Sequence, residues 1–505
     1  MTAGMTEVRD SAGPGKDALP RVLGPVTAFC VVVGSVIGSG IFIVPARVAQ
    51  AIPALGPIVL AWVVGGLFSA AGALTLAELG AMMPHAGGPY VYLREAYGRL
   101  PAFLFGWAEF LINRTGSMAT LAAAFARYFA QIVPAPEGVG TEIWQAGAAV
   151  AAIVVVTLVN VLGTALGGRL QVAGTAIKVG GIVALILLPF AAGGGSRANL
   201  GPIGPAAYDR TLLSGFMVAM VGVLWAYDGW MNLTPLAEEV RDPGRNIPRA
   251  LGLGIAVLVA LYVTMTLMYH YVLPMAQVAS AGGAKGASQA VAATYCRTLL
   301  GPKGVMAISL LVMCSTFISL NGNALTGPRA YFAMARDGLF FPRLCRIHPR
   351  FSTPSSAIIA QGSWAIGLTV FGTLMILSPA PGPDSALPAP LRLAWLELNQ
   401  TPLYDVLYTY VIFGANLFYL LAIASVFVLR VTRPDAPRPY RTWGYPVTPL
   451  LFIVASVYLL QDMLRQSPAE ALAGVAIILT GVPFYLWFAR SKPAAPLRTA
   501  GPMRQ

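Results

Sequence analysis

Charged side chains are scarce in this sequence. Only 10% of the 505 residues are Asp, Glu, Lys or Arg, compared with ~25% in soluble domains. Hydrophobic residues make up 57%, and the mean hydropathy is +0.70. One buried core cannot hold this much apolar surface, so most of it must face lipid. The composition therefore excludes an ordinary soluble protein and predicts an all-α protein that crosses the bilayer many times.

Cysteine and histidine are also rare, with four and three residues respectively. The predicted topology places no two of the cysteines on the same aqueous side of the membrane, so we expect no disulfide framework. The three histidines are scattered, and we find no HExxH, no GxSxG and no Cys/His cluster at membrane depth. These absences argue against an enzyme, a metal site and a bound cofactor.

Apolar runs of ~20 residues predict about 12 membrane spans. Their approximate ranges are 22–50, 56–83, 100–130, 145–166, 171–193, 211–240, 249–274, 303–335, 354–378, 402–430, 446–465 and 468–490. The aromatic and basic stretches 84–99 and 336–353 suit short helices on the inner membrane surface. The stretch 275–302 suits either a helical cap or an ordinary outside loop, and 379–390 is expected to be a loop.

The net charge of +13 would fit a nucleic-acid partner if the basic residues formed one patch. Most of the 33 Lys and Arg residues instead fall in alternate loops and in the two tails. The positive-inside rule then predicts cytoplasmic tails at 1–21 and 491–505 in a cell (inner) membrane protein. The lipid bilayer is therefore the expected partner, and no nucleic acid is expected.

Two predicted spans carry signals that break a helix. The first reads VVVGSVIGSGIFIVP, with Gly34, Gly38 and Gly40 near its middle, and the sixth contains Asp228 and Gly229 at mid-membrane. Each break opens a set of five spans, at 22–193 and 211–430, with two more spans at 446–490. This order predicts an inverted five-plus-five repeat with its site between two discontinuous helices. Alternatively, the glycines only allow close helix packing.

Such breaks offer groups that suit a zwitterion. The half-helix after the first break exposes backbone N–H groups, and Ser39 adds a hydroxyl, so this end favours a carboxylate. Carbonyl groups released near Val36, Trp225 and Asp228 would accept hydrogen bonds from an ammonium group. An α-amino acid is the simplest ligand with both groups. Trp225 could close over its side chain as a gate, or it could serve only packing.

Several long motifs, in order, resemble one family. They are GSVIGSGIFIVP, LAELGAMMPHAGGPYVYLREAYG, GWAEFLINR, LWAYDGWMNL, EEVRDPGRNIPRA and LNGNALTGPRAYFAMARDGLF. They are similar to the L-type amino acid transporters of the amino acid, polyamine and organocation superfamily, from about residue 22 to 460. The resemblance implies a LeuT-like fold and alternating access for amino acids without sodium. It also implies that Val36, Ser39, Gly40 and Ile41 bind substrate and that Trp225 is the gate.

Lys178 lies about eight residues into the fifth predicted span, ~12 Å from its cytoplasmic end, which is too deep for its charge to reach water easily. The resemblance implies that this lysine replaces the sodium ion of sodium-coupled relatives. Carbonyl groups of the first break and the hydroxyls of Ser315, Thr316 or Ser319 are the expected partners. A buried lysine could also couple transport to protons, or could pair with a carboxylate merely to hold the bundle.

Other charged groups at membrane depth have open roles. Asp228 could pair with a basic substrate side chain, which would extend the substrates from neutral to Lys- or Arg-like, or it could cap the half-helix that starts at Gly229. Glu78, Glu109 and Arg114 are expected to connect helices. Because five residues rotate about 140° around an α-helix, we do not expect Glu109 and Arg114 to pair with each other.

Animal members of the family are linked to a glycoprotein by a disulfide in the loop between the third and fourth spans. Residues 131–144 contain no cysteine, so we expect no such heavy-chain subunit. Obligatory exchange is the function that the resemblance favours. A proton-coupled importer and an amino acid sensor that does not transport are the alternatives.

Overall fold

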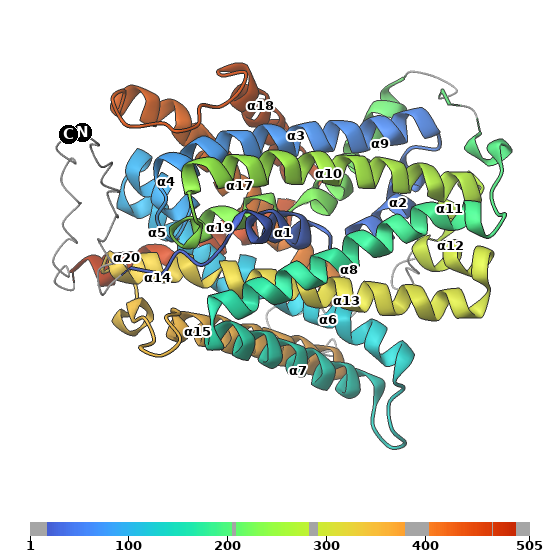
Figure 1. Ribbon diagram of the computed structural model, residues 1–505, viewed down its shortest axis with the longest axis horizontal. Coiled ribbons are helices and arrows are strands. Elements are labelled where there is room, and N and C mark those ends of the chain that lie inside the picture. The colour runs from blue at the N-terminus through green and yellow to red at the C-terminus, as the bar shows by residue number, and fades with distance from the viewer. Residues whose placement is uncertain are drawn as a thin grey trace, which may run out of the picture.

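The computed structural model describes residues 18–201, 203–204, 209–281, 291–378, 403–466 and 468–490. These residues form a bundle of long helices that run roughly parallel to one another (Figure 1). The loop predicted at 379–390, the C-terminal tail and residues 1–17 of the N-terminal tail lie outside the described residues. A fold of packed helices is what the composition predicts.

The helices follow one another with short connections. Residues 18–201 contain α1 (Pro25–Val36), α2 (Gly40–Ala51), α3 (Leu55–Met82), α4 (Pro89–Tyr97), α5 (Arg99–Ala108), the π-helical turn η1 (Glu109–Asn113), α6 (Arg114–Ile132), α7 (Thr141–Leu162), α8 (Thr164–Ala191) and the 3₁₀ turn η2 (Arg197–Leu200). Residues 209–378 contain α9 (Arg210–Tyr227), the 3₁₀ segment η3 (Trp230–Glu239), α10 (Pro243–Val272), α11 (Met275–Ser280), α12 (Val291–Leu300), α13 (Pro302–Thr326), α14 (Pro328–Arg336), the 3₁₀ turn η4 (Pro342–Cys345) and α15 (Ser355–Leu377). The remainder contains α17 (Leu403–Thr432), α18 (Val447–Gln466), α19 (Pro468–Leu479) and α20 (Gly481–Arg490).

Ten described helices are long and apolar enough to cross a membrane, and the bent pair α1 and α2 makes an eleventh candidate. The sequence predicts one more span at 100–130. In the structure this segment is the succession α5, η1 and α6, which contains a π-turn and carries Glu109 and Arg114 at its middle. The π-turn and the two charged residues explain why this segment is not among the long apolar helices.

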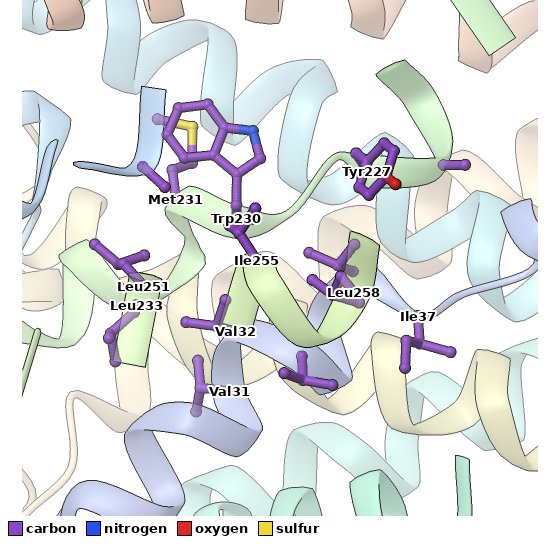
Figure 2. Close-up of a cluster of buried hydrophobic side chains, with 14 of the residues drawn as sticks. Val31, Val32, Ile37, Tyr227, Trp230, Met231, Leu233, Leu251, Ile255 and Leu258 are labelled. Carbon is purple, nitrogen blue, oxygen red and sulfur yellow. The ribbon is translucent and has the colours of Figure 1, made fainter. Parts of the chain in front are cut away.

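Both predicted helix breaks are present. The first lies between Val36 and Gly40, where the chain bends by 41°. The second lies at Asp228 and Gly229, and Gly229 has a φ of 106°, a left-handed conformation that side chains with a Cβ rarely adopt. Figure 2 shows the non-helical chain between Tyr227 and Trp230 at this second break.

The broken segments are held by apolar packing. Figure 2 shows Val31 and Val32 of α1 facing Leu251 and Ile255 of α10, with Leu233 of η3 beside them. All five side chains are buried. Because the surrounding core fixes both half-helices, the breaks persist as defined gaps rather than collapsing into continuous helices.

The two ends of the bundle carry different elements. Helices α4 and α14 lie at one end and α11 and α12 at the other (Figure 1). We call these the α14 end and the α12 end. The stretch 84–99 therefore does contain a short helix, whereas 336–353 contains only the turn η4. At the α12 end, the described part of 275–302 consists mainly of the helices α11 and α12, so it is not an irregular loop.

Candidate functional site

Lys178 lies in the middle of α8 with its side chain 1% exposed. Its Nζ donates hydrogen bonds to the carbonyl oxygens of Gly34, at 2.6 Å, and Ile37, at 2.5 Å. Both carbonyls belong to the first break, where the helical pattern stops and leaves acceptors available. A third bond of 2.8 Å reaches Ser319 Oγ on α13. Lys178 thus connects three elements around a main-chain gap.

The three candidate hydroxyls of α13 have different partners. Ser319 accepts from Lys178 and also donates to the Ile37 carbonyl at 3.0 Å. Ser315 donates to the carbonyls of Ile37 and Gly38, at 3.2 and 3.0 Å. Thr316 instead bonds to carbonyls of its own helix. Ser315 and Ser319 therefore belong to the polar cluster around Lys178, and Thr316 does not.

A cavity lies beside this cluster. Its empty space, including the open mouth, is about 680 Å³. Its lining comes from both breaks and from α6, α13 and α17, and consists of Ser35, Val36, Gly38, Ser39, Gly40, Glu109, Asn113, Arg114, Ser117, Leu121, Trp225, Ala226, Asp228, Gly229, Asn232, Ser319, Asn323, Ala415 and Tyr419. The position between two discontinuous helices is the one that the sequence predicts.

Most of the predicted substrate residues line this cavity. Val36, Ser39 and Gly40 are among the lining residues, whereas Ile41 is completely buried and is not. Helix α2 begins at Gly40, and its cap residue Ser39 makes no capping bond through its side chain. The Ser39 hydroxyl is therefore not used to cap the half-helix. The Val36 carbonyl already accepts a bond of 3.3 Å from Tyr262.

Trp225 and Asp228 stand between this cavity and a second one. The second cavity, of about 520 Å³ with its mouth, is lined mainly by α3, α9 and α17, and shares Trp225, Asp228, Ala415 and Tyr419 with the first. Asp228 Oδ1 accepts a hydrogen bond of 3.0 Å from the Tyr419 hydroxyl. The backbone N–H of Gly229 also interacts with the Asp228 carboxylate. Asp228 thus faces the cavity while it contacts the start of the next segment.

Glu109 and Arg114 correct one expectation. Arg114 Nε donates to Glu109 Oε2 at 2.6 Å, and both side chains are nearly buried. The prediction that they do not pair was wrong because it assumed 3.6 residues per turn throughout. Residues 109–113 instead form a π-turn, in which i and i+5 lie one above the other. Glu78, by contrast, lies outside both cavities and pairs with Arg430 at 2.7 Å.

Arg114 extends this pair into a network that the sequence reasoning missed. Its Nη1 donates to Asn232 Oδ1 and, at 3.2 Å, to Asn323 Oδ1. These partners come from η3 and α13, so the guanidinium joins three elements in the cavity wall. The available signal was an arginine and two asparagines in otherwise apolar spans. Among the described residues, no three His, Cys, Asp or Glu side chains gather in a way that could hold a metal ion.

Comparisons with known proteins agree with this geometry. A family model described as amino acid permease matches residues 23–488. The b(0,+)-type amino acid transporter 1 of Homo sapiens is 33% identical over 500 residues, which cover 95% of this chain and 91% of that protein. The serine/threonine exchanger SteT of Bacillus subtilis is 29% identical over 478 residues, which cover 94% of this chain and 98% of SteT.

A third relative is the large neutral amino acids transporter small subunit 2 of Oryctolagus cuniculus. It is 31% identical over 503 residues, which cover 96% of this chain and 84% of that protein. Family match and relatives extend over nearly the whole described bundle, including both breaks and the cavity. The chain therefore belongs to the amino acid permease family, within its L-type amino acid transporter branch, and is a multi-pass membrane transporter of amino acids rather than an enzyme.

Proposed function

We propose that this chain exchanges α-amino acids with uncharged side chains across the cell membrane by alternating access, without sodium. The observation that carries the proposal is the position of Lys178. Its ammonium occupies a site formed by two main-chain carbonyls and a serine hydroxyl at the first break. Oxygen atoms of these kinds also bind alkali cations, so a fixed positive charge stands where a coupling ion would otherwise be required.

The two breaks recognise the groups that all α-amino acids share. The start of α2 at Gly40 directs backbone N–H groups and a positive dipole end toward the cavity, which suits the substrate carboxylate. The Ser39 hydroxyl adds a donor beside them. Carbonyl groups at the second break suit the ammonium group, and Trp225 closes the cavity over the bound substrate.

The membrane arrangement follows the charge distribution and the packing. Residues 22–193 and 211–430 form two inverted repeats, and both tails are cytoplasmic. In support, corresponding helices of the two sets pack on each other, namely α3 on α10, α6 on α13 and α7 on α15. The carrier works without a disulfide-linked heavy chain, since residues 131–144 contain no cysteine.

Uptake into proteoliposomes tests the proposal. Vesicles containing the purified protein are either empty or preloaded with unlabelled amino acids, and labelled amino acids are added in sodium-free buffer. We expect uptake only into preloaded vesicles. Uptake into empty vesicles that depends on an inward proton gradient would make the protein a proton-coupled importer, and binding without any uptake would make it a sensor.

A further inference from the structure

The cavity wall contains a cation and a carboxylate that are not paired with each other. Arg114 and Asp228 both line the cavity and interact electrostatically across it. Arg114 makes its ion pair with Glu109, whereas Asp228 is bonded to Tyr419. Two opposite charges thus line the same cavity, and each is bonded to a different partner.

Each of these groups keeps hydrogen-bonding capacity. A guanidinium has five N–H donors, and Arg114 uses Nε for Glu109 and Nη1 for Asn232 and Asn323. Among the described residues, none accepts a hydrogen bond from its Nη2. A carboxylate has about four acceptor positions, of which Asp228 uses one for Tyr419 and one for the Gly229 N–H. The cavity therefore presents spare donors on one side and spare acceptors on the other.

The formal charges around the cavity cancel. Arg114 and Lys178 carry positive charge, and Glu109 and Asp228 carry negative charge. A side-chain ammonium group near Asp228 would also meet the guanidinium of Arg114. A side-chain carboxylate near Arg114 would meet the carboxylates of Glu109 and Asp228. Because an additional net charge is costly in a buried site, a neutral side chain fits better than either.

We propose that Arg114 and Asp228 together select amino acids whose side chain ends in a hydroxyl or an amide. Such a group accepts a hydrogen bond from Arg114 Nη2 and donates one to the Asp228 carboxylate. Small neighbours in the wall, Ser117, Ala226 and Ala415, leave room for it. This inference deepens the proposed function and rests on it. Arg114 and Asp228 then bind the substrate side chain as a pair without net charge. Asp228 does not serve as a receptor for basic side chains.

Competition between isosteric amino acids tests this inference on the wild-type protein. Unlabelled Thr, Val, Asn, Leu, Lys and Glu compete with labelled Ala for entry into preloaded proteoliposomes. Thr and Val have nearly the same shape, so their ratio isolates the hydroxyl. We expect Thr to inhibit about 10- to 100-fold more strongly than Val, the effect of a hydrogen bond to a charged group. Asn should likewise exceed Leu, and Lys and Glu should be weak.

Two variants separate selection from folding. Glu109→Gln with Arg114→Gln removes the guanidinium and its charged donors without leaving one buried charge alone, and the Thr to Val ratio should fall about tenfold. Asp228→Asn gives the cavity a net positive charge, and Glu should become a better competitor. The matched control, Glu239→Gln with Arg329→Gln, neutralises another buried ion pair outside the cavity, and its Thr to Val ratio should stay unchanged.

The outcomes are distinct. Equal inhibition by Thr and Val in the wild type would overturn the inference while leaving amino acid exchange intact. The same holds if Lys competes best, since Asp228 would then bind a basic side chain by itself. Absence of exchange for every amino acid would overturn the proposed function, and this inference with it.

Discussion

At the scale of single residues, Lys178 is distinguished by the kind of oxygen atoms around it. Its ammonium contacts two carbonyls and a hydroxyl, and its described hydrogen-bond partners include no carboxylate. A lysine that only held the bundle would be expected to meet an opposite charge. Neutral oxygens stabilise the cation without cancelling it, so its charge still acts on the first break and on the neighbouring cavity.

Removal of this charge is the first prediction. Lys178→Ala removes the charged donor of the Gly34 and Ile37 carbonyls and leaves them only serine hydroxyls, and exchange should fall about 10- to 100-fold because charged hydrogen bonds contribute ~1.5–3 kcal/mol. Ser319→Ala should cost only several-fold. Thr316→Ala is the matched control, since Thr316 bonds to its own helix, and it should stay within about twofold of wild type. Initial exchange rates per molecule of inserted protein provide the measurement; normal flux in Lys178→Ala would refute the role.

The sequence is sufficient to predict the type of partner for Lys178 but not its identity. A lysine deep in a span requires acceptors, and the glycines of the first span mark where carbonyls are released. Ser315, Thr316 and Ser319 are close in sequence, and only the rotation of α13 against α8 decides which hydroxyls face the ammonium. That rotation depends on packing between elements, which no local pattern contains.

At the scale of elements, the helix breaks can be predicted from the sequence, whereas the π-turn cannot. Glycine and a mid-membrane aspartate weaken a helix locally, so the breaks near Val36 and Asp228 are readable from the sequence. The π-turn at 109–113 has no comparable signal. Its extra residue places Arg114 over Glu109, where the guanidinium also bonds to Asn232 and Asn323 of other elements. Part of the cavity wall therefore could not be predicted.

A close approach of two elements gives the second prediction. A Cβ added to Gly40 would lie 2.8 Å from the backbone Cα of Ala226, so α2 would have to move away from α9. We expect Gly40→Ala to lower the exchange rate at least about tenfold and to lower the thermal unfolding temperature in detergent.

Gly180 supplies the control for this substitution. It lies in α8, and a Cβ at this position would meet no atom within 4 Å. Gly180→Ala should therefore leave the exchange rate unchanged and should not lower the unfolding temperature, since alanine favours a helix. If both alanine variants behaved alike, the contact between α2 and α9 would have no special importance.

At the scale of the whole molecule, the cavity has connections toward both ends of the bundle. Toward the α12 end, α2 packs on α9, α11 and α12. Toward the α14 end, Glu238 accepts bonds from the Leu19 and Ala86 N–H groups and pairs with Arg336 at 3.0 Å. Alternating access requires one set of contacts to separate while the other holds. The hydrogen bonds and the ion pair of Glu238 require a defined geometry, so these contacts can re-form in the same arrangement at each transport cycle.

The adjacent carboxylate, that of Glu239, is buried more deeply than that of Glu238. Glu239 pairs with Arg329 at 2.8 Å, both side chains are 0% exposed, and Thr164 donates to Glu239 at 2.7 Å. These contacts join the end of η3 to α14 and to the start of α8. The pair therefore connects the second broken helix to two helices that do not line the cavity.

Arg329→Met should destabilise the protein strongly, because it leaves Glu239 charged and buried without its partner, a loss of ~3–5 kcal/mol. The double variant with Glu239→Gln removes both charges and should recover a large part of the unfolding temperature. Arg336→Gln is the control, since its ion pair is partly exposed and should contribute only ~0–1 kcal/mol. Thermal unfolding in detergent measures all three. If the double variant were as unstable as Arg329→Met, packing of the arginine side chain, and not the buried charge, would hold η3 to α14.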